Sequence, residues 1–178
     1  NTTAEATRLG VTMFDLHASG STEMMQRAVN EVNKICRTEK LTRPKMLAVT
    51  VLTSLNREDL KRVGVRSDVQ HQVVRLARLA LEAGMDGVVA SPHEIAPIRS
   101  ECGHAFLIVT PGVRPGREGS WEDQKRVMTP EAAIQSGADY LVVGSPIRDA
   151  HDPVAAARDM VAAMERGYLA RGRRARRQ

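Results

Sequence analysis

The chain has 178 residues, of which 42% are hydrophobic and 3% aromatic, and its formal net charge is +5. This length suffices for one good core, so a single domain is the expectation. No apolar run approaches the roughly 18 residues that span a bilayer, and the start has neither a signal peptide nor an initiating Met, which predicts a cytoplasmic chain that is processed or incomplete at its N-terminus.

The positive charge is concentrated at the C-terminal end of the chain. Residues 166–178 contain six arginines and no acidic residue, and without them the net charge is −1. Such a run is typical of a solvated terminus, and the low aromatic content offers no platform for stacking bases, so nucleic acid is not the expected partner. We therefore expect a folded domain over 1–167 and a flexible basic extension over 168–178.

Apolar strands and amphipathic helices alternate along the whole chain. Strands are predicted at 11–18, 45–54, 86–92, 106–113 and 139–147, and helices at 2–9, 22–37, 56–65, 69–83, 93–99, 131–136 and 153–171. Regular alternation of this kind predicts a parallel α/β sheet. A doubly wound sheet is one alternative, although no Gly-x-Gly-x-x-Gly motif follows any strand. An eight-stranded barrel is the other, and the chain is about three units, roughly 60–90 residues, too short for it.

Two consecutive loops carry signals for phosphate binding. The loop over 114–128 is rich in glycine, contains Trp121 and Gln124, and leads into a helix capped by Thr129. The next strand ends in Gly144-Ser145-Pro146. Glycine at the end of a strand lets backbone N–H groups approach an anion, and barrels often bind phosphate in the loops after their last two strands. Taken alone, Gly-Ser-Pro fits an ordinary turn equally well.

Metal and disulfide patterns are absent from the sequence. Cys36 and Cys102 lie far apart without a Cys-x-x-Cys spacing, so we expect free thiols. His93-Glu94 lacks the second histidine of a zinc-binding helix. The sequence therefore predicts no metal site.

Six blocks together resemble the bacterial orotidine 5′-phosphate decarboxylases, in that family's order and at about its intervals. They are His17–Gly20, Ala48–Ser54, Gly84–Pro92, Val109–Pro115, Asp123–Pro130 and Gly137–Ile147. The similarity covers nearly everything up to about Gly167. It implies a (β/α)₈ barrel, a homodimer when full-length, and conversion of orotidine 5′-phosphate to UMP and CO₂ in pyrimidine biosynthesis without metal or organic cofactor. It also implies that this chain holds the fourth to eighth βα units.

The resemblance assigns six residues to substrate binding. Thr2 matches the threonine that ends the family's Asp-x-Lys-x-x-Asp-Ile-Pro-Asn-Thr segment, and Thr53 matches the position that hydrogen-bonds the pyrimidine. Arg114 and Gln124 match residues of the loop that closes over phosphate and base. Gly144 matches the glycine whose backbone amide meets the phosphate, and Ser145 stands beside it.

Two departures from the family pattern stand out. The Asp-x-Lys-x-x-Asp motif, whose lysine protonates the substrate in the family, does not occur in this sequence. No catalytic residue is therefore expected in the chain, which should bind nucleotide weakly and fail to decarboxylate by itself. Ser145 stands where the family has an arginine, and Arg148 is the candidate to compensate.

Two alternative functions remain at this point. One is a metal-dependent phosphate-sugar barrel enzyme of the same superfamily. The other is a remnant without catalysis that binds nucleotides or nucleic acid. In every case a sheet of five strands would leave an unpaired edge at strand 11–18.

Overall fold

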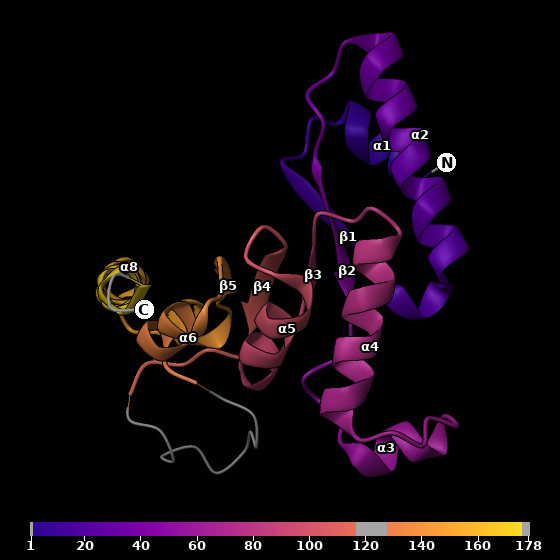
Figure 1. Ribbon diagram of the computed structural model, residues 1–178. Coiled ribbons are helices and arrows are strands. Elements are labelled where there is room, and N and C mark those ends of the chain that lie inside the picture. Colours follow the sequence, from indigo (N-terminus) through magenta and orange to yellow (C-terminus); the bar gives the residue numbers. More distant parts are fainter. Residues whose placement is uncertain (1, 117–127, 176–178) are drawn as a thin grey trace.

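The computed structural model describes residues 2–116 and 128–175, and within them the core is a five-stranded parallel sheet (Figure 1). The strands lie side by side in chain order: β1 (Met13–His17), β2 (Lys45–Val49), β3 (Gly87–Val89), β4 (Leu107–Pro111) and β5 (Tyr140–Val142). The helices are α1 (Thr2–Arg8), α2 (Thr22–Glu39), α3 (Arg57–Arg62), α4 (Val69–Glu82), α5 (Ile95–Cys102), α6 (Pro130–Ser136), α7 (Ser145–Arg148) and α8 (Pro153–Ala175). Short 3₁₀ turns occupy Ala18–Gly20 and Pro92–Glu94.

The sequential strand order decides between the two predicted architectures. Right-handed crossovers that always step in the same direction place every connecting helix on one face of the sheet. The side chains of Ala48, Val88 and Ile108, which are matched across neighbouring strands, all belong to the core beneath the helices. The topology is therefore that of a barrel wall, and the doubly wound alternative, which needs a reversal of strand order, is wrong.

Helix boundaries follow from local capping chemistry, and the cap predicted at Thr129 is among them. The Ser21 hydroxyl accepts a hydrogen bond from Met24 N at 3.3 Å and begins α2. Asn56 and Asp59 form a capping box at the start of α3. Thr129 caps α6 through Ala132 N at 3.2 Å, and Gly137 ends that helix at φ 118°, a left-handed conformation that favours glycine.

The strands are shorter than predicted, and the last one is not buried. β2 ends at Val49 because the chain turns away after Thr50, whose N–H and hydroxyl both donate to Val89 O. β5 spans only Tyr140–Val142, and these two side chains are 46% and 52% exposed. Within the described residues, β5 has a strand partner on one side only, which accounts for this exposure. The segment predicted as the end of that strand forms α7 instead.

Helix α8 continues four residues beyond its predicted end at Arg171 and reaches Ala175. The predicted boundary between the domain and the basic extension, after residue 167, thus falls inside a continuous helix. Gly167 lets α8 approach α6 closely, because a Cβ atom there would lie 2.3 Å from Glu131 O. Within the described residues, no helix is both long and apolar enough to cross a membrane.

Two aspartates clamp the beginnings of neighbouring strands. Asp86, just before β3, accepts a hydrogen bond from Met46 N at 2.9 Å and pairs with Arg43 at 2.7 Å. Asp139, just before β5, accepts from Ile108 N at 2.8 Å and pairs with Arg99 at 2.5 Å. Each carboxylate therefore joins its own strand to the preceding one at the amino end of the sheet.

Arg99 makes more hydrogen bonds than any other side chain of these clamps. It is almost fully buried, and it donates to Gly137 O at 3.0 and 2.8 Å and also to Phe106 O. These bonds tie the end of α5 to the end of α6 and to the start of β4. The amino end of the sheet is therefore a region of structural hydrogen bonds.

The N-cap of α4 predicts a dependence of stability on pH. Asp68 accepts hydrogen bonds from His71 N at 2.9 Å and from the His71 ring at 2.5 Å, and these bonds hold the pKa of Asp68 below its usual value. A depressed carboxyl pKa stabilises the fold above the unfolded pKa, and that contribution is lost as the pH falls through the folded pKa. We expect urea midpoints to fall more from about pH 5 to about pH 2 in the wild type than in Asp68→Asn, which keeps the cap without titrating. Equal losses in both proteins would contradict this assignment.

Candidate functional site

The carboxyl ends of β4 and β5 form a small cavity that contains two of the predicted residues. Arg114, three residues after β4, and Ser145, three residues after β5, line a cavity of about 320 Å³ together with Pro115, Pro146 and Asp149. Neighbouring parallel strands end at the same edge of the sheet, so the loops that follow them meet there. The structure thus brings together the first residues of the two loops in which the sequence predicted phosphate binding.

The first of these loops is anchored to the start of the segment before α6. Gly112 turns the chain at φ 77°, a left-handed conformation that favours glycine. Val113 then forms a parallel bridge with Met128, and Arg114 N donates to Met128 O at 3.1 Å. This bridge holds the backbone of Arg114 at the rim of the cavity.

The second loop offers open space beside Gly144. A Cβ atom added to this residue would have no neighbour within 4 Å. Gly144 O accepts hydrogen bonds from Ile147 N and Arg148 N, both at 3.0 Å, and so begins α7. Ser145 is the first residue of that short helix, and its hydroxyl is a neutral donor next to the cationic side chain of Arg114.

Arg148, the residue predicted to compensate for Ser145, is held by its neighbour. Its guanidinium group donates to both carboxylate oxygens of Asp149 at 2.7 and 2.8 Å, and this pairing raises the pKa of Arg148 and lowers the pKa of Asp149. Asp149 lines the cavity and Arg148 does not. The fork therefore neutralises a carboxylate that would otherwise repel a phosphate.

The other predicted residues do not join this cavity. Thr53 lies half-buried in the turn after β2, at the same edge of the sheet but two strands away from β4. Thr2 is exposed in the first turn of α1 and lines a different hollow beside β1. Gln124 and Trp121 lie outside the described residues.

Sequence reasoning missed the prolines and the aspartate of this cavity. Pro115 and Pro146 each follow a predicted binding residue directly, so their position in the chain was the available signal. Asp149 had a signal as well, because an Arg-Asp dipeptide after a presumed phosphate loop indicates local pairing. Its presence makes the cavity less positive than the sequence suggested.

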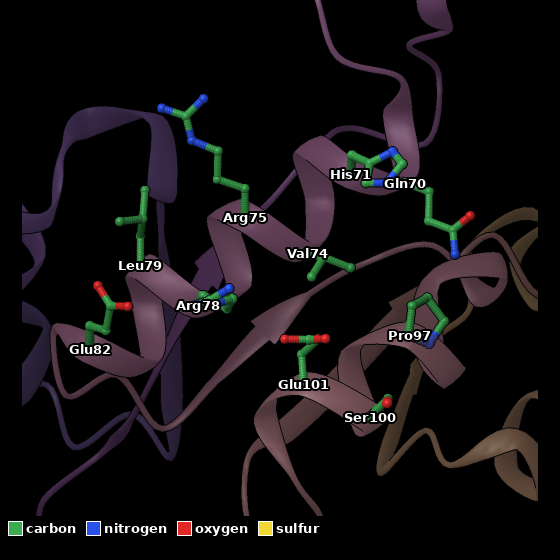
Figure 2. Close-up of a pocket in the computed structure, with 10 residues that line it drawn as sticks. All are labelled: Gln70, His71, Val74, Arg75, Arg78, Leu79, Glu82, Pro97, Ser100 and Glu101. Atoms are coloured by element: carbon green, nitrogen blue, oxygen red, sulfur yellow. The ribbon is translucent and has the colours of Figure 1, made fainter.

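A second, larger hollow shares no lining residue with this cavity. Figure 2 shows it between α4 and α5, where Arg75, Arg78, Glu82 and Glu101 surround it, and its volume is about 660 Å³. None of the predicted binding residues lines it. Two arginines and two glutamates line this groove, so it favours no ligand of one charge.

Metal ligands are not clustered in the described part of the chain. Residues 2–116 and 128–175 contain no group of three or more His, Cys, Asp or Glu side chains arranged to hold an ion. The chemistry that this site offers is that of hydrogen-bond donors and one cationic side chain at the edge of a parallel sheet.

Comparison with known proteins identifies relatives over most of the chain. Residues 1–160 match the sequence profile of the Orotidine 5'-phosphate decarboxylase / HUMPS family. The chain is 57% identical over 153 residues to an orotidine 5'-phosphate decarboxylase of Geobacter sulfurreducens, and 50% identical over 166 residues to one of Syntrophus aciditrophicus. These matches cover 86% and 93% of this chain but 63% and 66% of the two relatives.

A solved structure agrees with these relatives. The crystal structure of orotidine 5'-phosphate decarboxylase from Lactobacillus acidophilus superimposes with a TM-score of 0.78 at 33% identity. The superposition covers 92% of this chain and 68% of the other. The chain thus spans about two thirds of the length of each of these relatives.

Proposed function

This chain belongs to the orotidine 5′-phosphate decarboxylase / HUMPS family, and from that premise we propose that it is the phosphate- and pyrimidine-binding part of an orotidine 5′-phosphate decarboxylase. The reaction proposed for the whole protein is removal of CO₂ from orotidine 5′-phosphate to give UMP, without a cofactor. The observation that carries the proposal is the cavity in which Arg114 and Ser145 meet at the carboxyl ends of β4 and β5. In barrels this is where a phosphate is commonly held.

Each residue of the proposed site has a physical role. Arg114 supplies the charged hydrogen bonds that a phosphate dianion requires, and the Ser145 hydroxyl adds a neutral one. The open space at Gly144 lets the ligand approach the backbone. Thr53 and Gln124 are proposed to hydrogen-bond the base, and Thr2 to lie near the substrate.

Lys45, the first residue of β2, has a structural role and not one in proton transfer. Lys45 begins β2 and its ammonium group lies 3.4 Å from Asp86, at the amino end of the sheet. Substrates of barrel enzymes bind at the opposite end. We therefore propose that the chain alone binds the nucleotide and does not decarboxylate it, and that the catalytic lysine and aspartates lie on a segment outside this sequence.

Three further properties of the proposal come from the family resemblance. The whole protein is proposed to be a cytoplasmic homodimer. Residues 1–167 are proposed to form the partial barrel domain, with the basic extension following it. Nucleic acid has no part in this proposal, and a test of RNA binding with and without residues 171–178 separates it from the alternative of a nucleic-acid-binding remnant.

The proposal predicts that Arg114→Ala weakens the binding of UMP. Loss of a charged hydrogen bond costs about 1.5–3 kcal/mol, which corresponds to a dissociation constant about 10- to 150-fold higher. Isothermal titration calorimetry of the purified chain measures this change. Arg75→Ala, which removes the same side chain from the outer groove between α4 and α5, serves as the matched control and should leave the affinity unchanged.

Two more variants sharpen the result. Ser145→Arg should strengthen binding of UMP, because it adds a bidentate charged donor next to Arg114. Arg148→Ala should weaken it, since Asp149 would then face the phosphate without a neutralising partner. If UMP bound the Arg114→Ala and Arg75→Ala variants with equal affinity, the cavity would not be the phosphate site.

A further inference from the structure

His17, the last residue of β1, lies at the same edge of the sheet as the proposed phosphate site. All five strands are parallel, so the end of β1 and the residues that follow β4 and β5 share the carboxyl edge. The His17 side chain is exposed, and within the described residues its ring makes no hydrogen bond. A histidine that stabilised the fold would bond one of its groups, so this ring is available to a ligand.

The imidazole group of His17 points to the face of the sheet that the helices do not cover. Successive side chains of a strand point to opposite faces. Phe14 and Leu16 pack against the core beneath the helices, so His17 lies on the other face. That face is the inner side of the barrel wall, and the active sites of barrels lie at its carboxyl end.

His17 differs from its neighbours in the row of side chains that crosses this inner face. It is matched in register with Val49, Val49 with Val89, and Val89 with Val109. Val49 and Val109 are only 8% and 6% exposed, so this row closes the interior with apolar side chains. Among its members from β1 to β4, His17 alone carries side-chain atoms that donate or accept a hydrogen bond.

The phosphate cavity fixes one end of the ligand and leaves the other end free to reach β1. The cavity lies at the ends of β4 and β5, and three strand spacings separate β4 from β1, which is about 14 Å along the sheet. The curvature of a barrel wall brings side chains closer across its interior. A nucleotide whose phosphate contacts Arg114 can therefore extend its base across the carboxyl edge to Thr53 and His17.

We propose that His17 is a binding residue for the pyrimidine base, and that its ring nitrogens hydrogen-bond a polar edge of the base beside Thr53. A neutral imidazole offers one donor and one acceptor, and the edge of a uracil ring presents both carbonyl oxygens and an N–H group. This inference rests on the proposed function, because the phosphate at Arg114 sets the direction of the ligand. The role of His17 is nevertheless measured separately from that of Arg114.

The test compares UMP with ribose 5-phosphate, which has the phosphate but lacks the base. Isothermal titration calorimetry of the purified chain measures both dissociation constants. His17→Ala should raise that of UMP about 3- to 10-fold, as expected for loss of a neutral hydrogen bond, and leave that of ribose 5-phosphate unchanged. Arg114→Ala should weaken both ligands. His17→Gln keeps a donor and an acceptor and should restore part of the affinity for UMP.

His104→Ala is the matched control. His104 is also exposed, but it lies between α5 and β4, at the amino end of the sheet, so its removal should not affect UMP. Nuclear magnetic resonance of the histidine rings detects the contact directly. The His17 signal, identified by its absence in His17→Ala, should shift on addition of UMP and stay in place with ribose 5-phosphate. Circular dichroism verifies that the variants are folded.

Three results would contradict this inference in different ways. Equal affinity of the wild type and His17→Ala for UMP, with a loss in Arg114→Ala, would overturn it and leave the proposed function standing. Equal losses for UMP and ribose 5-phosphate in His17→Ala would also overturn it, because the substitution would then act through the fold and not through the base. A wild-type chain that bound no UMP would overturn the proposed function and this inference together.

Discussion

Asp139→Ala is expected to destabilise the chain by about 3–5 kcal/mol, because it leaves the buried guanidinium group of Arg99 without its counter-charge. The Arg99 side chain is only 7% exposed, so water replaces the lost partner poorly. The same change removes the acceptor of the Ile108 N–H group. Urea unfolding followed by circular dichroism measures the change in the free energy of unfolding.

Asp149→Ala provides the matched control for this prediction. It also removes an aspartate that pairs with an arginine, but the Arg148 and Asp149 side chains are 73% and 57% exposed. Exposed ion pairs contribute about 0–1 kcal/mol, so the unfolding midpoint should hardly move. Similar losses in the two variants would mean that the buried pair of Arg99 and Asp139 contributes no more to stability than an exposed ion pair does.

Gly87→Ala is expected to cost about 3 kcal/mol, although it adds a single methyl group. A Cβ atom at this position would lie 2.3 Å from Leu107 O and 2.5 Å from Leu107 Cβ. Gly87 and Leu107 are directly paired in neighbouring strands, so relief of the clash requires β3 and β4 to move apart. Thermal unfolding measures the loss as a lower transition temperature.

Gly172→Ala adds the same methyl group in helix α8, where nothing lies within 4 Å of the new atom. Alanine favours a helix over glycine by about 1 kcal/mol, so this variant should be unchanged or slightly more stable. Opposite signs for the two Gly→Ala variants are the expected result. A neutral Gly87→Ala would show that the strands tolerate a wider spacing than the register suggests.

The sequence predicted most of the fold because its signals are local. Apolar runs located all five strands, and Ser21, Thr129 and Gly137 marked helix ends through capping that involves residues at most four apart. The ends of β2 and β5 were wrong because a strand's length depends on its neighbours in the sheet. An apolar run such as 139–147 cannot reveal that β5 would have a partner on one side only.

The candidate site was predictable where it depended on which residues directly follow which strand. Arg114 and Ser145 meet because each follows one of two adjacent strands. The Arg148–Asp149 fork was overlooked, although the adjacency of the two residues in the sequence was its signal. The Arg99–Asp139 pair was missed for another reason, since its members are 40 residues apart and no motif links them.

The sequential order of the strands also has a meaning for synthesis on the ribosome. Within the described residues, each strand from β2 to β5 pairs with the strand that was translated just before it. Each of these four strands finds its docking edge already present when it leaves the exit tunnel. The growing sheet thus exposes only its newest strand at the advancing edge, and the pairing of neighbours follows the direction of translation.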